Sequence, residues 1–157
     1  MGDLSANFSL HEFTRSGTAQ RYRLDNIPDD LQRAAIAELA NNPCQWLRDQ
    51  LGRIDVTGGF VTPEVNALIA GRTQGGQHER GEAADLLPRY VDRWYAWGVL
   101  VAGVLHGLMP IDQAIVYDDK PHIHVSYIAR GGRRPNRTQL LYLPSGSRDY
   151  LPWQPWA

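Results

Sequence analysis

The segment VYDDKPHIHVSY, from Val116 to Tyr127, places two acids, Asp118 and Asp119, just ahead of a His-Ile-His triplet. The residues around the triplet are typical of a β-strand, in which residues i and i+2 face the same side. His122 and His124 would then point into one cavity, where imidazoles can bind a metal ion or move a proton. Taken alone, such a pair is more often structural or exposed than metal-binding, so a metal site needs a further ligand.

A glycine-rich stretch, GGQHERGEAADLL, supplies the other ligand types. It carries His78 in a loop and Asp85 seven residues later in a strand candidate, and Gly75, Gly76 and Gly81 allow the chain to fold back between them. Two histidines and one aspartate leave a tetrahedral Zn²⁺ with an open position for water, which is typical of catalytic rather than structural sites. The whole set therefore favours a catalytic zinc site.

The sequence predicts both helices and strands, and these elements must position the candidate ligands. A capping box predicts a short helix at Ser9 to Phe13, and the helical period from Pro28 to Leu51 is broken or restarted at NNPC. Further helices are expected from Thr62 to Gly71 and from Arg89 to Gly107. Strands are expected at RIDVTGG, AADLLP, QAIVY and HIHVSYI, the last two as neighbours.

Length and composition predict one domain. A chain of 157 residues with 43% hydrophobic content buries roughly 70% of its unfolded surface as a single core, and we take residues 143–157 as a Pro/Trp-rich tail of that domain. The net charge of −1 gives no overall attraction to nucleic acid, and the basic RGGRRPNR stretch is local. Cys44 is the single cysteine, which excludes an internal disulfide and favours a buried thiol.

Export and membrane signals are also missing from the sequence. The first residues, MGDLSANFSL, lack the basic and apolar regions of a secretory signal. The longest apolar run, Ala96 to Met109, is shorter than the ~20 residues that span a bilayer. We therefore expect a protein made in a cytoplasm, with no membrane and no nucleic acid among its partners.

Together these motifs resemble the zinc D-Ala-D-Ala carboxypeptidase family of metallopeptidases. QHERGEAADL is similar to the S-x-H-(six residues)-D element of that family, and YDDKPHIHVSY is similar to its H-x-H element, which hedgehog signalling domains share. The flanking ANFSLHEFTRSGTAQRYRLDNIP, VTGGFVTPEVN and VSYIARGGRRPNRTQ resemble the branch common in bacteriophage genomes. The resemblance covers about Leu4 to Leu141.

The resemblance implies an α+β fold in which a small antiparallel sheet, flanked by helices, floors a zinc cleft. It implies that His78, Asp85 and His124 bind Zn²⁺, and that His122 is the histidine that does not bind it but can stabilise the oxyanion of the reaction. The implied activity is hydrolysis of peptide bonds in bacterial peptidoglycan, by a phage or prophage protein such as an endolysin.

An acid upstream of the last ligand serves as general base in this family. The hedgehog-like spacing, six residues before the ligand, selects Asp118. The Asp-x-x-His spacing of other branches would select Asp119 and make His122 the ligand. HIHVS matches the first register more closely, so we favour Asp118 with His124.

The chain departs from the family at two positions. Many members carry an arginine in SGYRSP that binds substrate, where the aligned GGFVTP here has Val61, and the serine two residues before the first histidine is Gly76. Arg72, Arg80 or Arg130 could replace the arginine. Its absence weakens the case for a carboxypeptidase, so an endopeptidase is slightly favoured.

Two further hypotheses stay open. One is a zinc-containing binding module of the same fold without useful turnover, as in the hedgehog relatives. The other is a virion component that contacts other proteins through Trp153 and Trp156 of the tail. Apart from such a contact, we expect the protein to be a monomer. Either would act at the cell wall or within a phage particle after synthesis in the host cytoplasm.

Overall fold

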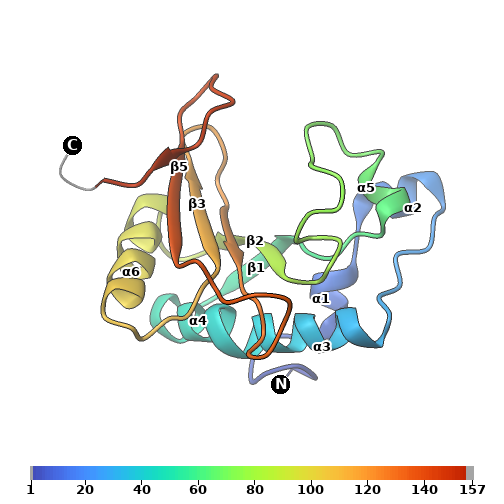
Figure 1. Cartoon of the computed structure of the whole chain (residues 1–157), viewed down its shortest axis with the longest axis horizontal. Coiled ribbons are helices and arrows are strands. Elements are labelled where there is room, and N and C mark those ends of the chain that lie inside the picture. The colour runs from blue at the N-terminus through green and yellow to red at the C-terminus, as the bar shows by residue number, and fades with distance from the viewer. Residues whose placement is uncertain (1, 155–157) are drawn as a thin grey trace.

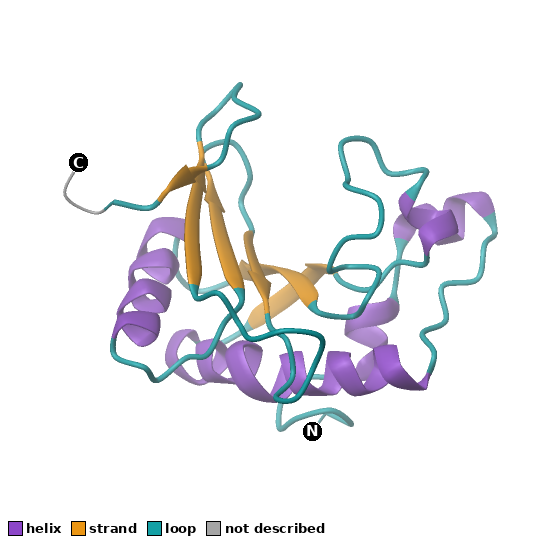
Figure 2. Ribbon diagram, viewed as in Figure 1, coloured by secondary structure: helices purple, strands orange, loops and turns teal. Residues whose placement is uncertain are grey.

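The computed structural model describes residues 2–154, and this part of the chain has an α+β fold built on one sheet (Figures 1 and 2). Within the described residues the sheet has six strands in the order β1-β2-β4-β3-β5-β6. The strands are β1 (Ile54–Gly58), β2 (Ala83–Pro88), β3 (Gln113–Tyr117), β4 (Ile123–Ser126), β5 (Gln139–Leu143) and β6 (Leu151–Pro152). All the strands expected from the sequence are present, and QAIVY and HIHVSYI are neighbours as predicted.

The sheet is mixed, whereas the resemblance implied an antiparallel one. The pairs β1–β2, β2–β4, β3–β4 and β5–β6 are antiparallel, but β3 and β5 are parallel. The reason is the return of the chain after the β3–β4 hairpin. Ser126, at the end of β4, pairs with Gln113 at the start of β3, and the following loop brings Gln139 beside that same residue. β5 therefore runs in the direction of β3.

The sheet separates a helix-covered face from an open face. Strand residues that face the helices are apolar and buried: Ala84, Leu86, Ala114, Val116, Ile123 and Val125. Their alternate neighbours face the other way and include Asp85 and His124. Because side chains alternate along a strand, one hydrophobic face anchors the sheet and leaves the opposite face for polar groups.

The helices surround the buried face and the end of the sheet near β1 (Figure 2). They are α1 (Leu10–Thr14), α2 (Gly17–Tyr22), α3 (Asp30–Leu39), α4 (Gln45–Leu51), α5 (Pro63–Asn66) and α6 (Arg93–Leu105). A π-helical turn, Ala40–Cys44, joins α3 to α4 and contains Pro43. This turn is the predicted interruption at NNPC: a proline inside a helix removes one backbone donor. The Cys44 thiol is buried, as expected.

Two helices are shorter than their sequence patterns indicated. The α6 helix begins after Asp92, whose side chain accepts hydrogen bonds from the backbone N–H groups of Trp94 and Tyr95 at 2.8 and 3.0 Å. The cap fixes the start of the helix four residues after the expected Arg89. The α5 helix begins at Pro63 with Thr62 as its N-cap, as predicted, but it ends at Asn66, and the chain continues through turns to Gly71.

The C-terminal tail is ordered against the domain as far as it is described. Leu151 of β6 pairs with Tyr142 of β5, and the Trp153 ring packs against both Trp94 and Trp97. Trp156, the other proposed contact residue, lies outside the described residues. Across the described chain, every helix is too short or too polar to cross a bilayer.

Candidate metal centre

Two of the predicted ligands are fixed by the pairing of neighbouring strands. Asp85 of β2 and His124 of β4 are direct partners in the antiparallel register. Both side chains project from the open face of the sheet, and His124 Nδ1 lies 3.2 Å from Asp85 Oδ1. The backbone ladder therefore sets the separation of these two groups.

The third ligand, His78, comes from the loop between α5 and β2. A tight turn forms because the N–H groups of Arg80 and Glu82 donate to the Gln77 carbonyl. Gly81 has a φ of +74°, and a Cβ there would lie 2.7 Å from a backbone oxygen of α3, so this position requires glycine. The His78 Nδ1 lies 2.8 Å from the Gly59 carbonyl oxygen, which can only accept. Nδ1 therefore carries the proton and leaves the Nε2 lone pair free.

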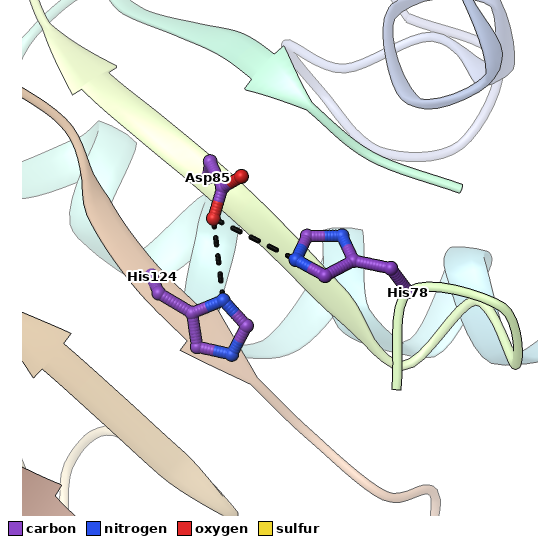
Figure 3. Close-up of side chains that lie close together, drawn as sticks. All are labelled: His78, Asp85 and His124. Carbon is purple, nitrogen blue, oxygen red and sulfur yellow. Dashed lines mark hydrogen bonds and ion pairs between the residues drawn. The ribbon is translucent and has the colours of Figure 1, made fainter. Parts of the chain in front are cut away.

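The three side chains converge on one point in front of the sheet (Figure 3). His78 Nε2 lies 3.7 Å from Asp85 Oδ1, and one donor atom from each of the three residues lies within 4.8 Å of the others. Tetrahedral ligands at Zn–N and Zn–O distances of 2.0–2.2 Å are separated by about 3.3–3.5 Å. The observed spacings of 3.2 and 3.7 Å bracket that range. Two imidazoles and one carboxylate are thus close enough together to hold a metal ion.

The protonation states of these groups also suit metal binding. Burial lowers the pKa of His78 to about 4, and the attraction of the Asp85 carboxylate only partly offsets this. Burial alone would raise the pKa of Asp85, but the hydrogen bond with His124 and the attraction of the three nearby imidazoles together outweigh it and hold that pKa well below the usual range. At neutral pH the site therefore presents a neutral His78 and an ionised Asp85, the forms that bind metal.

The second carboxylate oxygen of Asp85 is held by an arginine. Arg72 Nη2 donates to Asp85 Oδ2 at 3.2 Å, which leaves Oδ1 toward the histidines. Gly58 makes room for this pair, because a Cβ there would lie 2.5 Å from Oδ2 and 3.0 Å from Nη2. Arg72 Nη1 is buried and has no hydrogen-bond partner among the described residues. A buried guanidinium nitrogen without a partner is costly, so Nη1 would gain from a hydrogen-bond acceptor that a bound ligand brings.

The site lies in a cleft of about 660 Å³, within the range of small-molecule and peptide sites. One wall is the segment after α5, which contributes Arg72 and His78, and strands β3 and β5 stand on the other side (Figure 1). The floor extends from His124 to Ile115 and Leu141, which are in register on successive strands. The cleft therefore continues well beyond the three candidate metal ligands.

The structure brings His122 into the same cleft. Its Nε2 lies 4.0 Å from Asp85 Oδ1, and its ring packs edge-on against Tyr117 at 5.3 Å between centroids. Burial lowers the pKa of His122 more than the Asp85 charge raises it. This histidine is thus placed beside the candidate metal ligands without being one of the closest three.

The two candidate bases lie elsewhere. Asp118 Oδ2 accepts hydrogen bonds from the Tyr142 hydroxyl at 2.6 Å and the Ser145 N–H at 3.1 Å. Among the described residues that line the cleft, neither Asp118 nor Asp119 is included. The hydrogen bond from Tyr142 lowers the pKa of Asp118. Asp118 could reach the cleft only by exchanging this partner.

The two positions at which the sequence departs from the D-Ala-D-Ala carboxypeptidase pattern lie in different places. Val61 is buried against Ala19 and Val65, outside the cleft, whereas Gly76 lines it. Of the three arginines that could replace the family's arginine, Arg72 is the one that lies at the site.

Sequence reasoning missed a second polar cluster. The carboxylate of Asp112 is fully buried and contacts Arg134, Arg137 and Gln77. Gln77 is the neighbour of His78, so the cluster touches the loop that carries a ligand. The available signal was an acid, Asp112, within an apolar stretch and followed some twenty residues later by RRPNR. The sequence alone does not show that this acid and these arginines contact one another.

The chain matches no protein-family model, and no curated protein matches it.

Proposed function

We propose that the protein is a zinc-dependent peptidase that cleaves peptide bonds in bacterial peptidoglycan, acting as an endopeptidase more readily than as a D,D-carboxypeptidase. The proposal combines the resemblance of the motifs with one structural observation. That observation is the convergence of His78, Asp85 and His124 on the floor of an open cleft. Structural zinc sites have four protein ligands, whereas three ligands in a cleft leave a position for water or substrate.

His78, Asp85 and His124 would hold the ion in this proposal. When bound, zinc supplies a Lewis acid that polarises a carbonyl and makes water a nucleophile near neutral pH. The Gly59 carbonyl and Arg72 orient His78 and Asp85, respectively. Such outer contacts typically change metal affinity or activity by about 10–100-fold when removed.

Two groups can stabilise negative charge on the substrate carbonyl. Arg72 lines the cleft and contacts Asp85 through Nη2, while its Nη1 has no partner among the described residues, and His122 Nε2 lies 4.0 Å from Asp85 Oδ1. Loss of one such donor typically costs a factor of about 10²–10³ in rate. Their positions support polarisation of the scissile carbonyl between the α5 loop and strand β4.

We assign proton transfer to Asp118, with Asp119 as the alternative. A carboxylate in this role accepts a proton from the attacking water and passes it to the leaving amine. Asp118 takes part only after its bond with Tyr142 is broken, so peptide binding would need to draw the Asp118–Lys120 turn toward the cleft.

The test is release of new amino groups from purified peptidoglycan by the zinc-loaded protein. A chelated sample and the His122→Ala variant serve as controls. Release that the chelator and the substitution both abolish supports the proposal, and mass spectrometry of the products then identifies the bond. Stoichiometric zinc with no release from several wall types would overturn it.

A second candidate function is a zinc-containing binding module without turnover. The observation that favours it is the engagement of Asp118 with Tyr142 and Ser145, away from the cleft. In that case the protein binds wall peptides at stoichiometric zinc, and bound peptide is recovered uncleaved.

A further inference from the structure

The buried carboxylate of Asp112 organises the end of the cleft where β3 and β5 begin, and it also accepts a hydrogen bond from Gln77 at 2.9 Å. Arg134 Nη1 donates to its Oδ1 and Arg137 Nη2 to its Oδ2, at 2.6 and 2.7 Å. The backbone N–H of Arg137 also donates to Oδ1, at 3.0 Å. One carboxylate thus faces two guanidinium groups, and the cluster keeps a net positive charge.

The two arginines lie on different sides of Asp112. Arg137 lines the cleft that contains the metal ligands, whereas Arg134 lines a separate hollow formed by the 127–136 loop. The side chain of Arg137 is 45% exposed. Its Nε and Nη2 contact Asp112, while its Nη1 donates to none of the residues that the structure describes. Arg137 is therefore held rigidly with one donor edge available to a ligand.

The cleft as a whole is cationic. Of the described residues that line it, Arg72, Lys120 and Arg137 carry positive charges, and Asp85 is the one carboxylate. Arg72 is engaged by Asp85, and Lys120 lies over the Tyr117 ring at 4.6 Å. A bound zinc ion would add further positive charge, so the cleft favours a ligand with more than one anionic group.

An apolar strip connects the metal ligands to Arg137. Ile115 and Leu141 are buried together on the open face of β3 and β5, in register with His124. Leu141 is two strands from His124, which corresponds to about 10 Å at the usual strand spacing. Beyond this strip, the Gln113 and Gln139 side chains are hydrogen-bonded at 2.8 Å. An extended peptide can thus place small apolar side chains on the strip and reach the Arg137 end.

We propose that Arg137 binds a carboxylate of the substrate at the β3–β5 end of the cleft, so that the site selects peptides with an acidic group beyond the apolar strip. This inference rests on the proposed function. It adds the substrate class, a carboxylate-bearing wall peptide, and a specificity residue that is neither a metal ligand nor part of the proton transfer. The carboxylate is either the C-terminal one or that of an internal glutamate.

Arg134 supplies a matched control, because it contacts the same carboxylate from outside the cleft. Arg134→Gln and Arg137→Gln each remove one guanidinium from Asp112 and leave the other. If the arginines act only by stabilising the Asp112 cluster, the two variants behave alike. If Arg137 binds substrate, only its variant weakens peptide binding.

The experiment uses synthetic wall tetrapeptides containing an internal glutamate in three forms: unmodified, amidated at the C-terminus, and amidated at the glutamate. Their dissociation constants are measured by calorimetry on zinc-loaded protein in the His122→Ala background, which is expected to lack turnover. We expect Arg137→Gln to raise the dissociation constant of the unmodified peptide by about 10- to 100-fold, the effect of one hydrogen bond to a charged group. Arg134→Gln should leave it unchanged. One of the two amidated peptides should bind weakly both to the protein with Arg137 and to Arg137→Gln. The carboxylate that is blocked in that peptide is the one that Arg137 recognises.

Equal weakening in both arginine variants, or equal binding of all three peptides by the Arg137-containing protein, would overturn the inference. Turnover of the same peptides by the wild-type protein is measured separately. Selective binding without turnover would refute the peptidase function and leave the carboxylate site standing. Turnover of all three peptides without selective binding would support the peptidase function and refute the carboxylate site.

Discussion

Asp85 and His124 are cross-strand partners, and their side chains meet on the open face of the sheet with Oδ1 and Nδ1 3.2 Å apart. The register of β2 against β4 therefore determines whether the candidate metal site exists. A one-residue slip of either strand would turn its own member of the pair to the opposite face of the sheet and separate the two side chains. The third group, His78, depends instead on a loop held by the turn at Gly81 and by the Gly59 carbonyl.

Substitution of His124 by alanine should remove the metal, whereas substitution of His122 should retain it. His124 is one of the three converging donors, and His122 Nε2 lies farther from Asp85, at 4.0 Å. Zinc at about 100 times its dissociation constant stabilises the folded state by about 2.7 kcal/mol. We expect this gain to disappear in His124→Ala and to persist in His122→Ala, as measured by thermal unfolding with and without zinc. Retained zinc in the first variant and lost zinc in the second would reverse the ligand assignment.

Asp118→Asn should lower kcat/KM by about 10²–10⁴-fold if Asp118 is the general base. Asp119→Asn, which changes the exposed neighbouring acid, is the control and should have little effect. Loss of activity in the control instead would move the base to Asp119 and favour the alternative register.

Tyr142→Phe tests the same assignment from the other side. The Tyr142 hydroxyl lowers the pKa of Asp118 by donating to its charged form. Its removal should raise that pKa, so the acid limb of the kcat/KM profile should move to higher pH. A profile identical to that of the wild-type protein would mean that Asp118 is not the titrating group.

Arg72→Ala should lower kcat/KM by about 10²–10³-fold while zinc stays bound, because it removes the donor beside the substrate carbonyl. Arg80→Ala is a suitable control, since Arg80 is an exposed arginine of the same loop. Metal content is measured on both variants by atomic emission. Loss of zinc from Arg72→Ala would instead assign Arg72 to holding Asp85 in place.

Asp112→Asn should destabilise the fold by about 1.5–3 kcal/mol at neutral pH, because Arg134 and Arg137 lose their charged hydrogen-bond partner but stay partly in contact with water. Burial would raise the pKa of Asp112, but the hydrogen bonds from Arg134 and Arg137 hold it well below the usual value. Its stabilising contribution is therefore complete above the unfolded-state pKa near 3.9 and is lost as the pH falls below that value. Urea unfolding should show a difference between wild type and Asp112→Asn at pH 7 that shrinks toward pH 2. A difference in unfolding free energy that stays constant with pH would mean that Asp112 does not stabilise the fold through its charge.

Several strands, and the shared face of Asp85 and His124, could be predicted because their signals are local. Alternation along AADLL and HIHVS indicates which residues share a face, and it places Asp85 and His124 opposite to the apolar residues. The direction of β5 could not be predicted in this way. Its parallel pairing depends on where the loop after Ser126 returns, and no periodicity records that path.

The positions of the charged side chains were harder to anticipate than their types. Arg72 was one of three equivalent arginines in the sequence, and only the fold brings it to Asp85. Asp118 has the expected spacing from His124, yet the hydroxyl of Tyr142 on β5 draws its carboxylate away from the cleft. Competition between distant partners for one carboxylate is a tertiary effect that spacing cannot reveal.

The outer strand beside β5 has a consequence for self-association. An exposed sheet edge presents free N–H and C=O groups on which strands of another molecule can assemble. Here that edge is β6, which has two residues, and one of them is Pro152, which has no N–H to donate. The short strand caps β5 while offering almost no template of its own, so this side of the sheet is protected against strand-by-strand aggregation.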